Sequence, residues 1–238
     1  MDWDAFFTLH DGLPREGPGD GESLDWALAL AGVPEDGVIC DACCGPGADI
    51  AGLLAHVPQG RVEAPDLHGP FAIRAAARFA DDPRVTVRQG DMGDLSGAYD
   101  LIWPAGALYF LGVAEGLARW RGALSPGGAV AFSEACWCTS APSAAARAAW
   151  AEEYPQMTDE AGVTAQVSAA GYRILGQRRL SDAAWEAYCT PMEARIAALR
   201  PGADAALASV LDEAETEIAT WRACRTEFGH LLTVARPA

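Results

Sequence analysis

The chain has 238 residues, of which 50% are hydrophobic and 21% charged, an ordinary composition for a globular protein. Seventeen arginine and lysine residues stand against 33 aspartate and glutamate residues, giving a formal net charge of −16. This acidity argues against nucleic acid and anionic membranes as partners, because their phosphates require a basic protein surface. No apolar run reaches the roughly 20 residues that span a bilayer, and the acidic amino terminus differs from a secretory signal. We therefore expect a cytoplasmic protein whose seven cysteines are reduced thiols.

Apolar residues predict an alternation of strands and helices as far as Cys136. The glycine- and proline-rich stretch 13–21 should be irregular, and a helix should follow it, with Ser23 as its N-cap and Gly32 as its stop. Strands are then expected over 37–42, 61–64, 84–88, 99–103 and 129–133, with helices over 48–57, 70–79 and 112–124. Strands and helices that alternate at intervals of roughly 20 to 30 residues indicate βαβ units and a parallel sheet.

The rest of the chain is predicted to be richer in helix. Helices are expected over 141–153 and 159–170, and two late strands over 172–175 and 229–235. A long helical insert separates those strands, and Pro191 should kink or split its first part. Its second part has an apolar stripe opposite its charges, made of Leu207, Val210, Leu211, Ala214, Ile218, Trp221 and Phe228.

These elements predict an α/β fold: a doubly wound, Rossmann-like, mostly parallel sheet with helices on both faces. No repeat or low-complexity linker interrupts the sequence, so residues 1–238 are expected to form a single domain. Within it, residues 1–32 would form an N-terminal loop and helix, and residues 37–136 a ligand-binding core. Residues 137–238 would supply the C-terminal helices and the last two strands.

A glycine-rich turn follows the first expected strand. The strand ends at Asp41, and Gly45-Pro46-Gly47 leads into a helix, which would expose backbone amides to a ligand at the switch point of the sheet. The spacing differs from the dinucleotide pattern G-x-G-x-x-G. The acid before the turn would repel a pyrophosphate and suits a ligand that carries an amino group. An ordinary tight turn without a ligand remains the structural alternative.

Two further acids follow the next two strands. Asp66 comes after the second strand, where a carboxylate can accept hydrogen bonds from both hydroxyls of a ribose. Gly90, Asp91 and Met92 come after the third strand, where a side chain can meet an exocyclic amine and a backbone amide a ring nitrogen. Each signal alone also fits a solvated loop. Together, at the ends of successive strands, they predict one ligand-sized site.

On these residues the chain resembles the class I S-adenosylmethionine-dependent methyltransferases. Asp41, Gly45 and Gly47 look like the first family motif, D-x-G-C-G-x-G, while Asp66 and the pair Asp91-Met92 look like its ribose and adenine contacts. Residues 126–128 (PGG) are similar to the family's turn before the fifth strand. The stretch 13–19 (LPREGPG) is similar to one found in bacterial small-molecule methyltransferases. The resemblance implies seven strands with the last antiparallel, and S-adenosylmethionine as the cofactor.

The resemblance also implies a set of cofactor-binding residues: Gly17, Asp41, Ala42, Cys43, Gly45, Gly47, Asp66, Leu67, Gly90, Asp91, Met92 and Pro104. Three positions depart from the family pattern. Cys43 replaces the first motif glycine, Pro65 precedes the ribose acid, and the pair 104–105 (PA) stands where related chains carry more polar residues.

The expected function is methyl transfer from S-adenosylmethionine to a small-molecule acceptor. His10, Tyr109, Glu134 and His230 are candidate general bases, although each also fits an ordinary surface or core-edge position. No metal site is expected, because Cys136 and Cys138 lack two further ligands nearby. A non-catalytic S-adenosylmethionine-binding protein and a nicotinamide-dependent oxidoreductase remain alternatives. The sequence leaves open the acceptor, the methylated atom and the oligomeric state.

Overall fold

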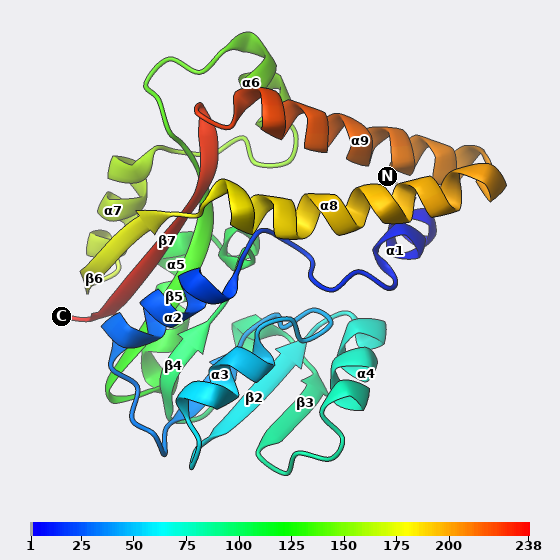
Figure 1. Ribbon diagram of the computed structural model, residues 1–238. Helices are drawn as coiled ribbons and strands as arrows, with labels where there is room; N and C mark the ends of the chain where they lie inside the picture. Colours follow the sequence, from blue (N-terminus) through cyan, green and yellow to red (C-terminus); the bar gives the residue numbers. More distant parts are fainter. Residues whose placement is uncertain (1) are drawn as a thin grey trace.

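One seven-stranded sheet runs through the molecule (Figure 1). The structure is a computed structural model that describes residues 2–238. The strand order is β3-β2-β1-β4-β5-β7-β6. Strands β1 to β5 are parallel, whereas β7 is antiparallel to both β5 and β6. The bounds are Val38–Asp41 (β1), Arg61–Asp66 (β2), Val85–Gln89 (β3), Tyr99–Trp103 (β4), Leu124–Trp137 (β5), Tyr172–Arg179 (β6) and Phe228–Pro237 (β7). The predicted doubly wound α/β fold with an antiparallel last strand is confirmed.

Helices cover both faces of this sheet and its carboxyl edge. Those of the core and the N-terminal region are Trp3–His10 (α1), Gly21–Ala31 (α2), Ile50–His56 (α3), Gly69–Arg78 (α4) and Val113–Trp120 (α5). The later helices are Ala144–Trp150 (α6), Glu160–Ala169 (α7), Asp182–Leu199 (α8) and Ala205–Cys224 (α9). Short 3-10 helices span Met92–Asp94 (η1), Leu108–Phe110 (η2), Arg121–Ala123 (η3) and Arg200–Gly202 (η4). None of the helices within residues 2–238 combines the length and the apolar character needed to cross a membrane.

The apolar core divides into three clusters because strand side chains alternate between faces. Leu101 of β4 packs with α2 and α3 on one face, and its neighbour Ile102 packs with α5 and α7 on the other. The third cluster lies beneath the long helices α8 and α9, where the Trp185 and Trp221 rings stack with centroids 4.9 Å apart. Figure 1 shows α8 and α9 as a pair above the carboxyl ends of the strands, with α1 against them.

Several sequence-based boundaries were wrong. Asp20, not Ser23, caps α2: its carboxylate accepts from the Ser23 amide at 2.8 Å, since an aspartate at this position satisfies a free helical N–H. Phe228 belongs to β7 rather than to the helical stripe. Helix α1 was not predicted at all, and Asp2 caps it at 3.0 Å.

The prediction was that Pro191 would kink or split this segment, and helix α8 continues through Pro191 without a split. A proline in a helix removes one backbone hydrogen bond. Buried residues on both sides of it, including Tyr188 and Met192, pack into the third cluster, which stabilises the helix on either side of the proline.

Candidate functional site

The carboxyl ends of the parallel strands are joined directly by backbone hydrogen bonds. The Ala42 amide donates to the Trp103 carbonyl at 3.1 Å, and the Cys43 amide donates to the Pro65 carbonyl at 2.9 Å. The Gly90 amide donates to the Asp66 carbonyl at 3.0 Å. These bonds bring together the three segments in which the sequence predicted ligand contacts, after β1, β2 and β3.

The turn after β1 depends on three residues with positive φ. Cys43 has φ 67°, Gly45 has φ 54° and Gly47 has φ 80°. A Cβ on Gly47 would lie 3.1 Å from Ile50 and 3.2 Å from Ala75, so this position has little room for a side chain. Cys43 is the one residue other than glycine with positive φ among residues 2–238, in a conformation that costs an L-residue roughly 1–2 kcal/mol.

Three carboxylates lie around this turn. Asp41 is 3% exposed and its Oδ2 atom has no hydrogen-bond partner. Burial, followed by the charges of Asp49 and Asp66, raises its pKa well above the ordinary value, and the Arg15 guanidinium opposes this rise. A buried carboxylate of this kind is stabilised by a cationic partner.

Arg15 is the basic residue whose charge opposes the raised pKa of Asp41. Its Nη2 donates to Asp49 Oδ1 at 2.8 Å, and the Trp103 indole donates to the other Asp49 oxygen at 3.0 Å. The segment 13–19, here called the N-terminal strap, therefore lies close to the turn. Asp49 and Trp103 were not predicted as site residues, although Asp49 precedes a helix and Trp103 ends a strand.

Asp66 is 3% exposed and holds two backbone groups. Its Oδ2 accepts from the Gly45 amide at 2.7 Å, and its Oδ1 accepts from the His68 amide at 2.8 Å. Each oxygen of a carboxylate can accept a second hydrogen bond. Asp66 thus fixes the glycine-rich turn and still has acceptor capacity for hydroxyl groups.

The predicted adenine contacts lie on the neighbouring edge. The Leu67 side chain is 64% exposed, which leaves an apolar surface beside the buried Asp66. Asp91 is exposed, with one oxygen accepting from the Gly93 amide at 2.7 Å, and Met92 is buried beside it. Gly90 bonds to β2 through its backbone.

The remaining predicted cofactor residues take different positions. Ala42 is fully buried in the core, so its side chain faces away from the turn. Gly17 lies in the N-terminal strap, where its carbonyl accepts from Arg15 at 3.4 Å. Pro104 is buried directly after β4, next to the bridge between Ala105 and Ser133.

The four candidate bases divide into two groups. His10 pairs with Glu16 at 2.5 Å in the N-terminal region. The second group consists of Glu134 on β5, Tyr109 on η2 and His230 on β7. Burial lowers the pKa of His230 to about 4, its Nδ1 has no partner, and its ring meets Trp185 edge-on at 5.2 Å.

Glu134 is the most unusual of the candidates. It is 1% exposed, and neither carboxylate oxygen has a hydrogen-bond partner. Burial raises its pKa to about 7, and the Tyr154 hydroxyl nearby opposes that rise. This places a buried group that exchanges a proton near neutral pH at the carboxyl edge of the sheet.

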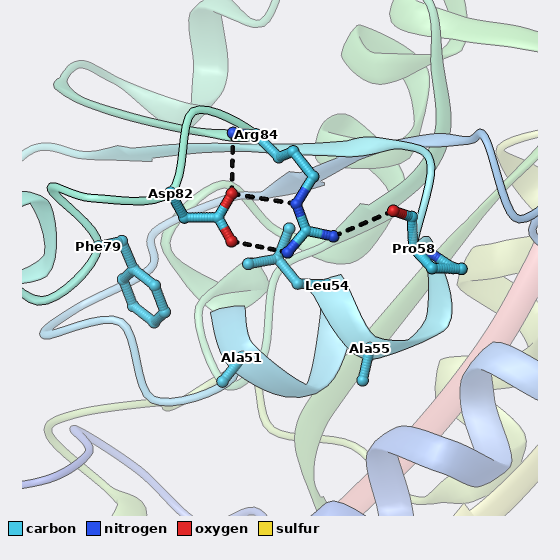
Figure 2. A pocket seen from close by; sticks show the side chains of 7 residues that line it. All are labelled: Ala51, Leu54, Ala55, Pro58, Phe79, Asp82 and Arg84. Carbon is cyan, nitrogen blue, oxygen red and sulfur yellow. Dashed lines mark hydrogen bonds and ion pairs between the residues drawn. The ribbon is translucent and has the colours of Figure 1, made fainter.

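A shallow pocket elsewhere has no chemistry of this kind. Figure 2 shows it between α3 and the residues before β3, at the amino edge of the sheet. Asp82 and Arg84 form an ion pair at 2.6 Å there, and Arg84 also donates to the Pro58 carbonyl at 3.3 Å. Within residues 2–238, no cluster of three or more histidine, cysteine, aspartate or glutamate side chains is arranged to hold a metal ion.

The buried Glu134 carboxyl predicts a pH-dependent stability. A carboxyl whose pKa is higher in the folded than in the unfolded chain lowers stability as the pH rises from 4.5 to about 7. The free energy of unfolding of Glu134→Gln should therefore equal that of the parent chain at pH 4. Above pH 7 it should exceed that of the parent by about 2–4 kcal/mol. Urea unfolding over this pH range measures the effect. The exposed control Glu152→Gln should follow the parent, and an equal pH profile for both variants would contradict the assignment.

The sequence matches known methyltransferases over part of its length. A family model described as a methyltransferase domain matches residues 39–128. Ribosomal RNA small subunit methyltransferase H of Shewanella denitrificans is 40% identical over 65 residues, which cover 27% of this chain and 20% of that protein. The match therefore spans a fifth of that relative's length.

Solved structures match the whole chain. A methyltransferase from Geobacter sulfurreducens in complex with S-adenosyl-L-homocysteine has a TM-score of 0.84 at 18% identity, covering 99% of this chain and 98% of that one. Another from Thiobacillus denitrificans, also in complex with S-adenosyl-L-homocysteine, has a TM-score of 0.80 at 19% identity, covering 98% of each chain. The chain therefore has the same fold as these two methyltransferases, and its residues 39–128 match a methyltransferase domain.

Proposed function

We propose that the chain transfers a methyl group from S-adenosylmethionine to a small-molecule acceptor at the carboxyl edge of its sheet. The observation that carries this proposal is the pair of buried carboxylates Asp41 and Asp66 on either side of the positive-φ turn. The unpartnered Asp41 oxygen suits the amino group of the cofactor's methionine part. Asp66 suits the two ribose hydroxyls.

The other residues fit the same placement. The turn from Cys43 to Gly47 and Gly17 of the N-terminal strap would flank the methionine part. The exposed Leu67 side chain would cover one face of the adenine and lose its contact with water, which favours binding. Gly90, Asp91 and Met92 would meet the adenine edge, and Pro104 would lie near the methyl group.

The cofactor supplies an already activated methyl group, so the protein's contribution is alignment of the reactants and exclusion of water. A nicotinamide-dependent oxidoreductase is disfavoured, because the acid before the turn would repel a pyrophosphate. A non-catalytic binder remains the alternative that Cys43 motivates. Calorimetric titration with S-adenosyl-L-homocysteine and with NADH distinguishes a methyltransferase from the oxidoreductase. Measured methyl transfer to an acceptor distinguishes it from the non-catalytic binder.

Asp66 provides the first test of the cofactor placement. Asp66→Ala would leave ribose hydroxyls unpaired and release the Gly45 amide. We expect S-adenosyl-L-homocysteine affinity to fall by about 1.5–3 kcal/mol, together with some loss of folding stability because the residue is buried. Calorimetry measures the affinity and thermal unfolding the stability. Asp94→Ala, which removes an exposed acid of η1, is the matched control; an Asp66→Ala affinity within twofold of the parent would refute the role.

Cys43 provides the second test. Cys43→Gly removes the thiol from the turn and relieves a positive φ, so the relief offsets the roughly 0.5–1 kcal/mol that glycine's flexibility costs. We expect S-adenosyl-L-homocysteine to bind about two- to tenfold more tightly, up to ~1.4 kcal/mol, with no large drop in melting temperature. Cys43→Ala removes the thiol but keeps a side chain at positive φ, so it distinguishes the effect of the thiol from the effect of backbone strain. If neither variant binds more tightly, the thiol does not obstruct the cofactor.

The acceptor class is tested against RNA, which the partial match to a ribosomal RNA methyltransferase makes the relevant competitor. The chain has a net charge of −16, and all 17 of its basic residues are arginines. It should not shift a ribosomal RNA fragment in an electrophoretic assay at physiological salt, because too few phosphates would be neutralised. A micromolar shift that weakens as salt increases would replace the small-molecule proposal with an RNA acceptor.

A further inference from the structure

Two tyrosines and a buried glutamate lie together beside the cofactor turn. Tyr109 of η2 and Tyr154, which follows α6, have ring centroids 5.9 Å apart at an angle of 51°. Glu134 of β5 lies next to the Tyr154 hydroxyl. We call Tyr109, Tyr154 and Glu134 the tyrosine–glutamate cluster. Three separate segments supply its members, so only the folded chain brings them together.

The cluster lies beside the loop after β4, because Ala105 of that loop forms a bridge with Ser133, the neighbour of Glu134. After burial itself, the Cys43 thiol is the group that raises the pKa of Tyr109 most. Cys43 belongs to the turn that the proposed function places against the methionine part of the cofactor. Tyr109 is 38% exposed, whereas Tyr154 is 9% exposed and Glu134 1%. The cluster therefore extends from the protein surface to a buried carboxyl group.

The electrostatic surroundings of the cluster are acidic. Glu153, Glu134 and Glu217 all raise the pKa of Tyr109, and Glu217 also raises that of the buried Tyr188 on α8. Glu153 and Glu217 keep solvent-exposed atoms, although burial by neighbouring atoms raises the pKa of Glu217 to about 7, whereas the Glu134 carboxylate is buried with both oxygens unpartnered. An unpartnered buried carboxylate is costly in a folded protein. An anionic acceptor would be repelled here, and a neutral one would leave Glu134 uncompensated.

We propose that the tyrosine–glutamate cluster binds the nitrogen of an amine, so that the acceptor is an amine and the reaction an N-methylation. This inference rests on the proposed function. Aromatic ring faces attract ammonium groups, and a carboxylate adds a charge-assisted hydrogen bond. Glu134 would be the catalytic base, and the two rings would hold the nitrogen in line with the methyl group.

The chemical step balances with the groups named. An ammonium acceptor first gives a proton to Glu134, and the freed lone pair forms the nitrogen–carbon bond to the sulfonium methyl. The carbon–sulfur bond breaks with its electron pair going to sulfur, which leaves a neutral thioether and a methylated ammonium. The raised pKa of Glu134, about 7, suits proton exchange near neutral pH.

The test uses benzylamine, whose ammonium group carries the positive charge and the N–H donors of an amine acceptor. Calorimetry compares it with benzyl alcohol and with phenylmethanesulfonate, using the full chain with and without S-adenosyl-L-homocysteine. We expect the cation to bind at least about tenfold more tightly than either comparison compound. Glu134→Gln and Tyr109→Leu should each weaken the cation by about tenfold, while Glu152→Gln should not.

Each outcome decides the inference. Cation binding that is lost in Glu134→Gln, with S-adenosyl-L-homocysteine affinity unchanged in that variant, supports it; the variant is expected to be more stable, so the loss would not reflect unfolding. Equal binding of the three compounds, or equal cation binding by the parent and Glu134→Gln, overturns it. Failure of S-adenosyl-L-homocysteine to bind would refute the proposed function instead, and the titration without it would still test the cluster.

Discussion

The site depends on the balance between buried carboxylates and one arginine at the carboxyl end of β1. Asp41 is enclosed with Asp49 and Asp66, and their mutual repulsion adds to the cost of burial. The Arg15 guanidinium pairs with Asp49 at 2.8 Å and offsets part of that cost. Asp66 also accepts a hydrogen bond from the Gly45 amide, so the same carboxylate contributes to the charge balance and to the conformation of the turn.

This balance links the N-terminal region to the rest of the molecule. The N-terminal strap continues from α1, which packs against α8 and α9 above the carboxyl edge. On its other side, the Phe7 ring of α1 stacks on His68, directly after the strand of Asp66, with centroids 3.6 Å apart. Helix α1 therefore connects the helical cover to the Asp66 side of the site. Movement of α1 would change both the cover over the site and the surroundings of Arg15.

The two halves of the carboxyl edge differ in the kind of polar group that they present. The half around β1 and β2 presents backbone amides and carboxylates at the ends of short strands, which suits a ligand with hydroxyl and amino groups. The half around β5 presents tyrosine rings and the buried Glu134. Both halves are acidic, and this suits a sulfonium donor and an amine acceptor, because each carries or develops positive charge during transfer.

The sequence by itself determined the alternation of strands and helices, the parallel sheet and the turn after Asp41, because apolar periodicity and glycine-rich turns are local signals. It also indicated Asp66 and Gly90, since the first ends a strand and the second directly follows one. It did not reveal helix α1, the continuity of α8 through Pro191, or the pairing of Arg15 with Asp49. Only the tertiary structure decided these features and the meeting of Tyr109, Tyr154 and Glu134, because they depend on packing between segments far apart in the chain, which no local pattern of residues records.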